Sequence, residues 1–216
     1  MGKDMINELR FFLKSSIRKQ VDLSLSDQSK GIPMPPKEKE TTESDNLIPL
    51  ISPEGFDDMT KMSVLEAIKL RETRRKFKSQ DPLTLKELSY LLYSTQGVRR
   101  KHNDIVYRTV PSAGNRHPFD TYVISLNIEG VEKGIYRYLP LSHSLVFHKK
   151  VDELEEKIDV ACNNQIFVSK GVAVFVWVGV PYRTEWRYMD FSHKSILLDA
   201  GHICQNLYLA SESIGY

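Results

Sequence analysis

The most informative stretch of this chain is Pro111-Ser112-Ala113-Gly114-Asn115-Arg116-His117-Pro118. Two prolines bound it, and a β-prone segment that begins at Thr121 follows directly. Small residues let backbone N–H groups and short polar side chains approach a flat heteroaromatic ring closely, which bulky residues would prevent. Loops of small residues are common, but eight consecutive residues of this composition are far more restrictive than a lone glycine motif. The stretch therefore indicates a binding loop for a planar ligand.

A second informative segment is Arg71-Glu72-Thr73-Arg74-Arg75-Lys76-Phe77, which follows a helix opened by a capping box of Ser63 and Glu66. Its guanidinium groups and single hydroxyl can surround a phosphate or a polarised carbonyl, because guanidinium donors lie in one plane. An isolated cluster of this kind is more often a solvated basic turn. The segment therefore gains meaning only together with the loop at residues 111–118.

Apolar spacing elsewhere predicts further helices. One helix follows Ser63. Thr84 and Glu87 form a second capping box, which opens another helix, and we expect Gly97 to end this second helix in a left-handed conformation. The remaining predicted helices span residues 6–19, 152–160 and 194–213. The helix over residues 194–213 carries little charge on any side, so we expect it to be buried.

Short β-prone runs occur at residues 121–126, 134–138 and 144–147. The run 172–178 is apolar on both faces, which predicts a central strand covered on both sides. Residues 22–58 keep no apolar period and are rich in polar residues and proline. We therefore expect residues 1–58 to form a helix with an extended polar arm, and residues 59–216 to form the domain.

Composition limits the class of protein. The chain has 216 residues, of which 41% are hydrophobic, and 30 basic residues stand against 28 acidic ones. Charge thus gives no reason to expect nucleic acid or a membrane surface as a partner, and no apolar segment has the length of a signal peptide or membrane span, so we expect a cytoplasmic protein. Cys162 and Cys204 are expected to be core thiols, and the six histidines lack the spacing of metal ligands, so no metal is expected.

Together, the loop and the basic segment resemble the FMN-dependent nitroreductase family. That family begins with an Arg-x-Ser/Thr-x-Arg/Lys-x-Phe stretch, matched here by Arg71, Thr73, Arg75 and Phe77, and continues with a Pro-Ser-Ala/Ser-x-Asn loop before a strand. Segments 91–97, 134–138, 199–202 and 205–207 also resemble the SagB-type dehydrogenase branch. The resemblance extends from about residue 22 to residue 216.

This resemblance implies an α+β fold with a mixed, mainly antiparallel sheet flanked by helices, in a homodimer with one FMN in each of two interface clefts. It implies contacts to the phosphate, ribityl chain or pyrimidine edge from Arg71, Thr73 and Arg75, and contacts to the isoalloxazine of the other subunit from Pro111, Ser112, Ala113 and Asn115. A cation or N–H beside the pyrimidine edge stabilises the negative charge that reduction places on the ring. NAD(P)H is expected to donate hydride in a ping-pong scheme, because the chain has no Gly-x-Gly-x-x-Gly or Walker-type loop.

Three functions remain open: a reductase or dehydrogenase acting on an unknown small-molecule or peptide acceptor, a peptide azoline dehydrogenase of thiazole and oxazole biosynthesis, and a non-catalytic flavin-binding or interaction protein. SagB-type azoline enzymes carry a Lys-Tyr pair where this chain has Arg187 and Tyr188. Arginine stays protonated and cannot accept the proton that a lysine could, which counts against the azoline reaction. Tyr188 is a weak catalytic candidate with simple packing as its alternative, and His202 and Gln205 are expected on a buried helix face.

Nitroreductase-family proteins continue after the long helix with a Gly-rich turn, a short helix and a final strand that bears a basic residue for the FMN phosphate. The sequence printed here ends at Tyr216. We therefore expect the domain to lack this segment, and with it part of the cofactor shell, which would leave a sheet edge exposed.

Overall fold

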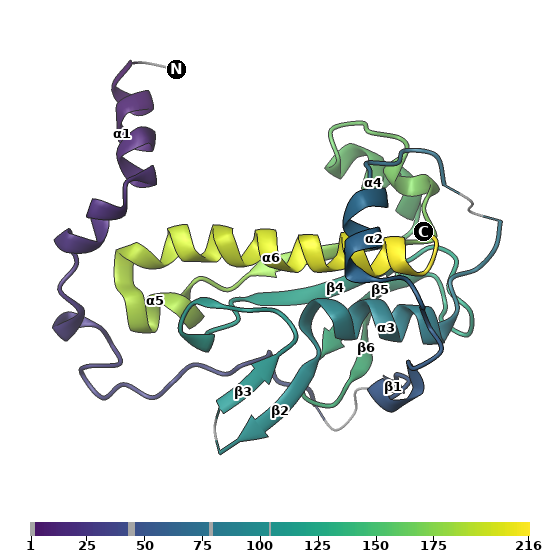
Figure 1. Cartoon of the computed structure of the whole chain (residues 1–216), viewed down its shortest axis with the longest axis horizontal. Helices are drawn as coiled ribbons and strands as arrows, with labels where there is room; N and C mark the ends of the chain where they lie inside the picture. Colours follow the sequence, from purple (N-terminus) through teal and green to yellow (C-terminus); the bar gives the residue numbers. More distant parts are fainter. Residues whose placement is uncertain (1–2, 43–45, 78–79, 104) are drawn as a thin grey trace.

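Figure 1 shows a computed structural model of the chain, which describes residues 3–42, 46–77, 80–103 and 105–216. Five strands form one antiparallel sheet in the order β1-β6-β5-β4-β7. Their bounds are β1 (Leu47–Pro49), β4 (Phe119–Ser125), β5 (Gly134–Leu139), β6 (Ser144–Lys149) and β7 (Ala173–Gly179). The predicted α+β fold with a mainly antiparallel sheet is thus confirmed.

Six α-helices and several 3-10 turns complete the described part of the chain. The α-helices are α1 (Lys3–Leu13), α2 (Val64–Leu70), α3 (Leu85–Gln96), α4 (Leu154–Ala161), α5 (Tyr182–Tyr188) and α6 (Ser192–Ser213). The 3-10 turns are η1 (Ser15–Gln20), η2 (Leu23–Leu25), η3 (Pro53–Gly55), η4 (Ala113–Asn115), η5 (Val168–Lys170) and η6 (Met189–Phe191). Both predicted capping boxes form, because each depends only on residues three positions apart.

The hydrophobic core lies between one face of the sheet and the helices α3 and α6. Leu88 and Leu92 of α3 are fully buried against Val123 of β4 and Leu145 of β6. Alternate residues of β4 from Phe119 to Ser125 are buried, as expected for a strand with one face on the core. The core therefore fixes the position of α6 along the sheet (Figure 1).

One strand prediction is wrong, and one hairpin was not predicted. β7 lies at an edge of the sheet, and Val176 and Val178 are exposed by 38% and 45%, so it is not a central strand in the single chain. Its β-branched composition reports local β preference, whereas strand order depends on distant pairing. The sequence also gave no sign of the hairpin of β2 (Val98–His102) and β3 (Ile105–Arg108), whose polar residues hide any apolar alternation.

The N-terminal region also differs from expectation. The predicted helix over residues 6–19 ends as an α-helix at Leu13 and continues as η1. α1 rises away from the body (Figure 1), and its apolar side chains, among them Leu9 and Leu13, are exposed. The arm that follows includes β1, which pairs with β6, so it is not wholly irregular. The division of the chain at residue 58 stays a prediction.

The arm is held across the face of the sheet opposite the helices. Arg137 lies opposite Tyr122 on that face, and the buried Arg183 forms an ion pair of 2.7 Å with Asp120 of β4. Arm residues 32, 36, 37, 39 and 40 accept hydrogen bonds through their backbone carbonyls from the side chains of Trp186, Arg183, Arg108 and Arg137. Because backbone carbonyls do the binding, the arm sequence needs no apolar period.

Gly97 ends α3 in an extended conformation with φ −60° and ψ 152°, not in the predicted left-handed one. A Cβ at this position would lie 2.1 Å from a ring atom of Tyr93. Glycine is therefore needed here because the Tyr93 ring packs against the backbone, and not because of its own dihedral angles.

Candidate functional site

The helix α6 supports both segments that the sequence singled out. Ile196, Ile203 and Ala210 face the core, whereas Leu197 and Leu198 are exposed by 66% and 60%. In the single chain only one face of this helix meets the sheet, so its outer face is exposed. α6 contacts η4 in the loop at residues 111–118 and also contacts α2, which leads into the basic segment.

Asp199 of α6 anchors the loop. Its carboxylate accepts a hydrogen bond of 2.6 Å from the Ser112 hydroxyl and one of 3.2 Å from the Ala113 backbone N–H. Burial raises the pKa of Asp199, while these two hydrogen bonds oppose that change. The Ser112 hydroxyl also accepts a hydrogen bond from the His117 backbone N–H at 2.8 Å. Ser112 therefore shapes the loop through its side chain, which is not free to donate to a ligand.

The tip of the loop adopts unusual backbone angles. Gly114, Asn115 and His117 have φ values of 57°, 58° and 49°. Asparagine adopts such left-handed angles more readily than most residues. The His117 ring is buried, and its Nε2 lies 2.8 Å from the Asn115 Oδ1. The Asn115 side chain is thus held by one atom, and its amide nitrogen has no hydrogen-bond partner among the described residues.

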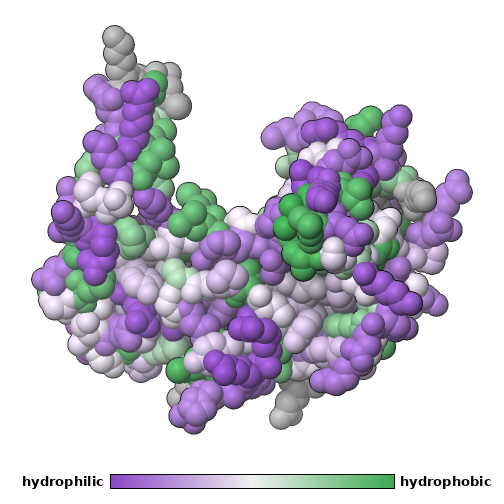
Figure 2. Space-filling view, in the orientation of Figure 1, coloured by the Kyte–Doolittle hydropathy of each residue, from purple (hydrophilic) through white to green (hydrophobic). Residues whose placement is uncertain are grey.

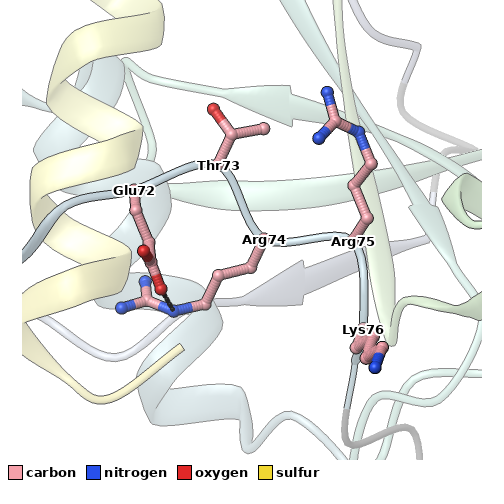
Figure 3. A pocket seen from close by; sticks show the side chains of 5 residues that line it. All are labelled: Glu72, Thr73, Arg74, Arg75 and Lys76. Atoms are coloured by element: carbon pink, nitrogen blue, oxygen red, sulfur yellow. Dashed lines mark ion pairs between the residues drawn. The ribbon is translucent and has the colours of Figure 1, made fainter.

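The basic segment is extended, so its side chains alternate in direction. Thr73 and Arg75 point to one side, and Glu72 and Arg74 point to the other (Figure 3). Arg74 forms two hydrogen bonds, of 2.5 and 3.2 Å, with the carboxylate of Glu212 near the end of α6. The segment is therefore fastened to α6 by Arg74, which leaves Thr73 and Arg75 on the opposite side.

The remaining cations of the segment are open to a ligand. The guanidinium carbon of Arg71 lies 6.0 Å from the ring centre of Tyr208, and that of Arg75 lies 5.6 Å from the ring centre of Phe167. Neither guanidinium forms a hydrogen bond or ion pair with any residue in the described ranges. Residues 72–76 line an open surface hollow of about 400 Å³ (Figure 3). Two uncommitted guanidinium groups and a hydroxyl form a donor set that suits a phosphate.

A single chain does not bring the two segments together. They are anchored at Asp199 and Glu212, 13 residues apart on one straight helix. At 1.5 Å per residue, these anchors are about 20 Å apart along the helix axis. The loop and the basic segment of one chain are therefore held at separate places along the same α6.

Tyr188 lies at the end of α5 and packs over the loop. Its hydroxyl is 2.4 Å from the point where a Cβ on Gly114 would lie. The ring also meets the Arg187 guanidinium, whose central carbon is 5.5 Å from the ring centre. Gly114 thus provides the space for the Tyr188 side chain, which is half-buried and lies beside the candidate binding loop.

Several functional side chains were missed or misplaced by the sequence. Asp199 and Glu212 gave no signal as anchors, because their partners lie 87 and 138 residues away along the chain. His202 and Gln205 are exposed and do not lie in the core. Cys162 and Cys204 are free and half-buried, so they are less enclosed than expected.

Other kinds of site were sought in the described ranges. No three His, Cys, Asp or Glu side chains there gather as metal ligands would. None of the helices formed by these residues combines the length and apolar character needed to cross a bilayer.

The residues present fit a flavin mononucleotide if two chains contribute to each site. The loop offers small residues from Ser112 to Gly114 and an amide donor at Asn115, which suit the edge of a planar ring. The open hollow at the basic segment offers cations for a phosphate. The fit thus rests on the donor chemistry of Asn115 and of the basic segment.

Residues 68–216 match the family model described as the Nitroreductase family. The chain is also 33% identical over 156 residues to a provisionally named nitroreductase of Methanocaldococcus jannaschii, which covers 70% of this chain and 77% of that protein. The match to the family model includes the basic segment and the loop, and it agrees with the resemblance found in the sequence.

Solved structures agree with this result. A provisionally named nitroreductase of Ralstonia eutropha has a TM-score of 0.63 at 28% identity, over 81% of this chain and 75% of that one. One from Anabaena variabilis has a TM-score of 0.61 at 22% identity, over 86% of this chain and 34% of that one. An E. coli microcin synthetase complex with a truncated precursor bound has a TM-score of 0.55 at 20% identity, over 77% of this chain and 64% of that one. The last two are likenesses of fold alone.

Proposed function

Because the chain belongs to the nitroreductase family, a family of oxidoreductases, we propose that it binds FMN and transfers hydride from NAD(P)H to an acceptor in a ping-pong scheme. The observation that carries this proposal is the pair of uncommitted donor sets held at two separate places on α6, at Asp199 and at Glu212. FMN, when bound, would supply the hydride chemistry. The chain's own residues bind the phosphate, orient the ring and place N–H donors at its edge.

We propose different roles for the two ends of the site. Arg71, Thr73 and Arg75 hold the phosphate, the ribityl chain or the pyrimidine edge. Asn115 donates from its amide to the ring, while Pro111, Ser112 and Ala113 provide its contact surface, with the Ser112 hydroxyl turned to Asp199. Tyr188 is kept as a weak candidate for a group that meets the acceptor, because it lies beside Gly114.

A homodimer would bring the donor sets of two different chains close together. Figure 2 shows that the molecule is hollowed between α1 and the part that contains α2 and α4, and α6 lies at the floor of this hollow (Figure 1). Leu197, Leu198 and Tyr208 on α6 are exposed large apolar side chains, a grouping typical of protein interfaces. Two copies packed through α6 in opposite directions would bring the loop of one toward the basic segment of the other.

The first test is the visible absorption spectrum of the purified protein with and without added FMN, together with its mass in solution. Bound-flavin bands and a dimer mass are expected. A colourless monomer that ignores added FMN would support a non-catalytic protein and reject the enzyme. The azoline dehydrogenase is not favoured, because the likeness to the microcin synthetase complex is of fold alone and Arg187 cannot accept a proton.

Variants then locate the cofactor. Arg75→Ala should weaken FMN binding about 10-fold or more, since a charge-assisted hydrogen bond contributes about 1.5–3 kcal/mol. Lys69→Ala, which removes an exposed charge on α2, is the matched control and should change little. Equal loss in both variants would mean that FMN responds to overall charge and not to this segment.

Subunit mixing tests whether each site is shared. Arg75→Ala and Asn115→Ala chains should each bind FMN weakly alone. If each site takes these residues from different chains, random mixing gives heterodimers with one intact site, and about a quarter of all sites should recover. If both residues serve a site within one chain, mixing should restore no FMN binding.

A further inference from the structure

A chain of hydrogen bonds links α6 to the side chain of Asn115. Asp199 accepts from Ser112, and Ser112 accepts from the His117 backbone N–H at 2.8 Å. The His117 ring then meets the Asn115 Oδ1 at 2.8 Å. The amide nitrogen of Asn115 has no hydrogen-bond partner among the described residues.

We propose that His117 is a positioning residue: its Nε2–H holds the Asn115 Oδ1 and so turns the Asn115 NH2 outward as the loop's hydrogen-bond donor. This inference rests on the proposed function, in which Asn115 meets a bound flavin. It also specifies the complementary ligand group, which must accept a hydrogen bond, such as a carbonyl oxygen or an unprotonated ring nitrogen.

The direction of the His117–Asn115 hydrogen bond follows from the surroundings of the imidazole. Burial, followed by the charges of Arg108, Arg116 and Lys37, lowers the pKa of His117 to about 3. The ring is therefore neutral at physiological pH and carries one proton. An amide oxygen can only accept, so that proton lies on Nε2.

The same contact opposes rotation of the Asn115 amide. Exchanging its oxygen and nitrogen would set the NH2 group against the Nε2–H, so the rotated amide fits only if the imidazole proton moves to Nδ1. The position of this proton and the orientation of the amide are therefore linked. Asn115 is also held at φ 58° and His117 at φ 49°, so the backbone fixes the positions from which both side chains extend.

A double-mutant cycle on FMN binding tests this role. His117→Phe keeps a ring but removes the donor, and should weaken FMN binding about 10-fold. His117→Gln keeps an N–H donor and should remain within about threefold of the natural chain. In an Asn115→Ala background, His117→Phe should have almost no further effect, because His117 acts only through Asn115. A full His117→Phe effect in that background, or equal losses in Phe and Gln variants, would overturn the proposal.

The flavin-free natural chain gives a second readout that does not require any variant to fold. Long-range ¹H–¹⁵N spectra should find His117 as the neutral Nε2–H tautomer at pH 6. The Nδ1–H tautomer or a charged ring at that pH would contradict the positioning role alone. Failure of the natural chain to bind FMN would instead reject the proposed function, so the two failures can be told apart.

Discussion

Removing the Asp199 carboxylate should detach the loop from α6. The side chain is 3% exposed and accepts hydrogen bonds of 2.6 and 3.2 Å, from the Ser112 hydroxyl and the Ala113 N–H. Hydrogen bonds to a charged group contribute about 1.5–3 kcal/mol each, but burial of the charge offsets part of this. We therefore expect Asp199→Ala to lower the free energy of unfolding by about 3 kcal/mol. Asp199→Asn keeps one acceptor and should lower it by about 1–1.5 kcal/mol.

Urea denaturation of the flavin-free chains measures these differences, and fluorescence titration measures FMN affinity. Asp190→Ala is the matched control, because Asp190 is exposed just before α6 and has no hydrogen-bond partner among the described side chains. It should change the free energy of unfolding by less than about 0.5 kcal/mol. If Asp199→Ala is as stable as this control and binds FMN normally, Asp199 does not hold the loop.

Three further predictions concern the same site. The pKa of His117 is about 3 in the folded protein against 6.5 ordinarily, so its contribution to stability is complete above pH 6.5 and declines as the pH falls toward 3; between pH 6.5 and 5, urea denaturation should show the natural chain losing about 1.6 kcal/mol more than His117→Gln, and parallel pH profiles would exclude this. Glu212→Gln removes the charge that binds Arg74, and should lower the unfolding free energy by about 1–2 kcal/mol together with FMN affinity; an unchanged melting temperature would argue against this anchor. Gly114→Ala forces a Cβ toward the Tyr188 side chain at φ 57°, and should cost about 1–2 kcal/mol in denaturation; an equal cost in a Tyr188→Ala background would mean that the dihedral angle, not the contact with Tyr188, is responsible.

The features predicted correctly from the sequence are those that depend on near neighbours. The capping boxes at Ser63 and Thr84 join residues three positions apart, and the β-prone runs became β4, β5 and β6. The ordered motifs at Arg71 and Pro111 indicated the family, which the family model then confirmed. The individual contacts to FMN stay predictions.

The features that the sequence could not supply depend on distant partners. The edge position of β7, the exposed outer face of α6 and the docking of the arm on buried arginines follow from strand order and packing. Gly97 illustrates the difference: the sequence identified the end of the helix, but the Tyr93 ring decided its conformation. By itself, the sequence determined local structure and family, because hydrogen bonds and spacing over a few residues specify both. Only the tertiary structure decided that Asp199 and Glu212, about 20 Å apart along α6, anchor the loop and the basic segment, because packing brings together residues far apart in the chain.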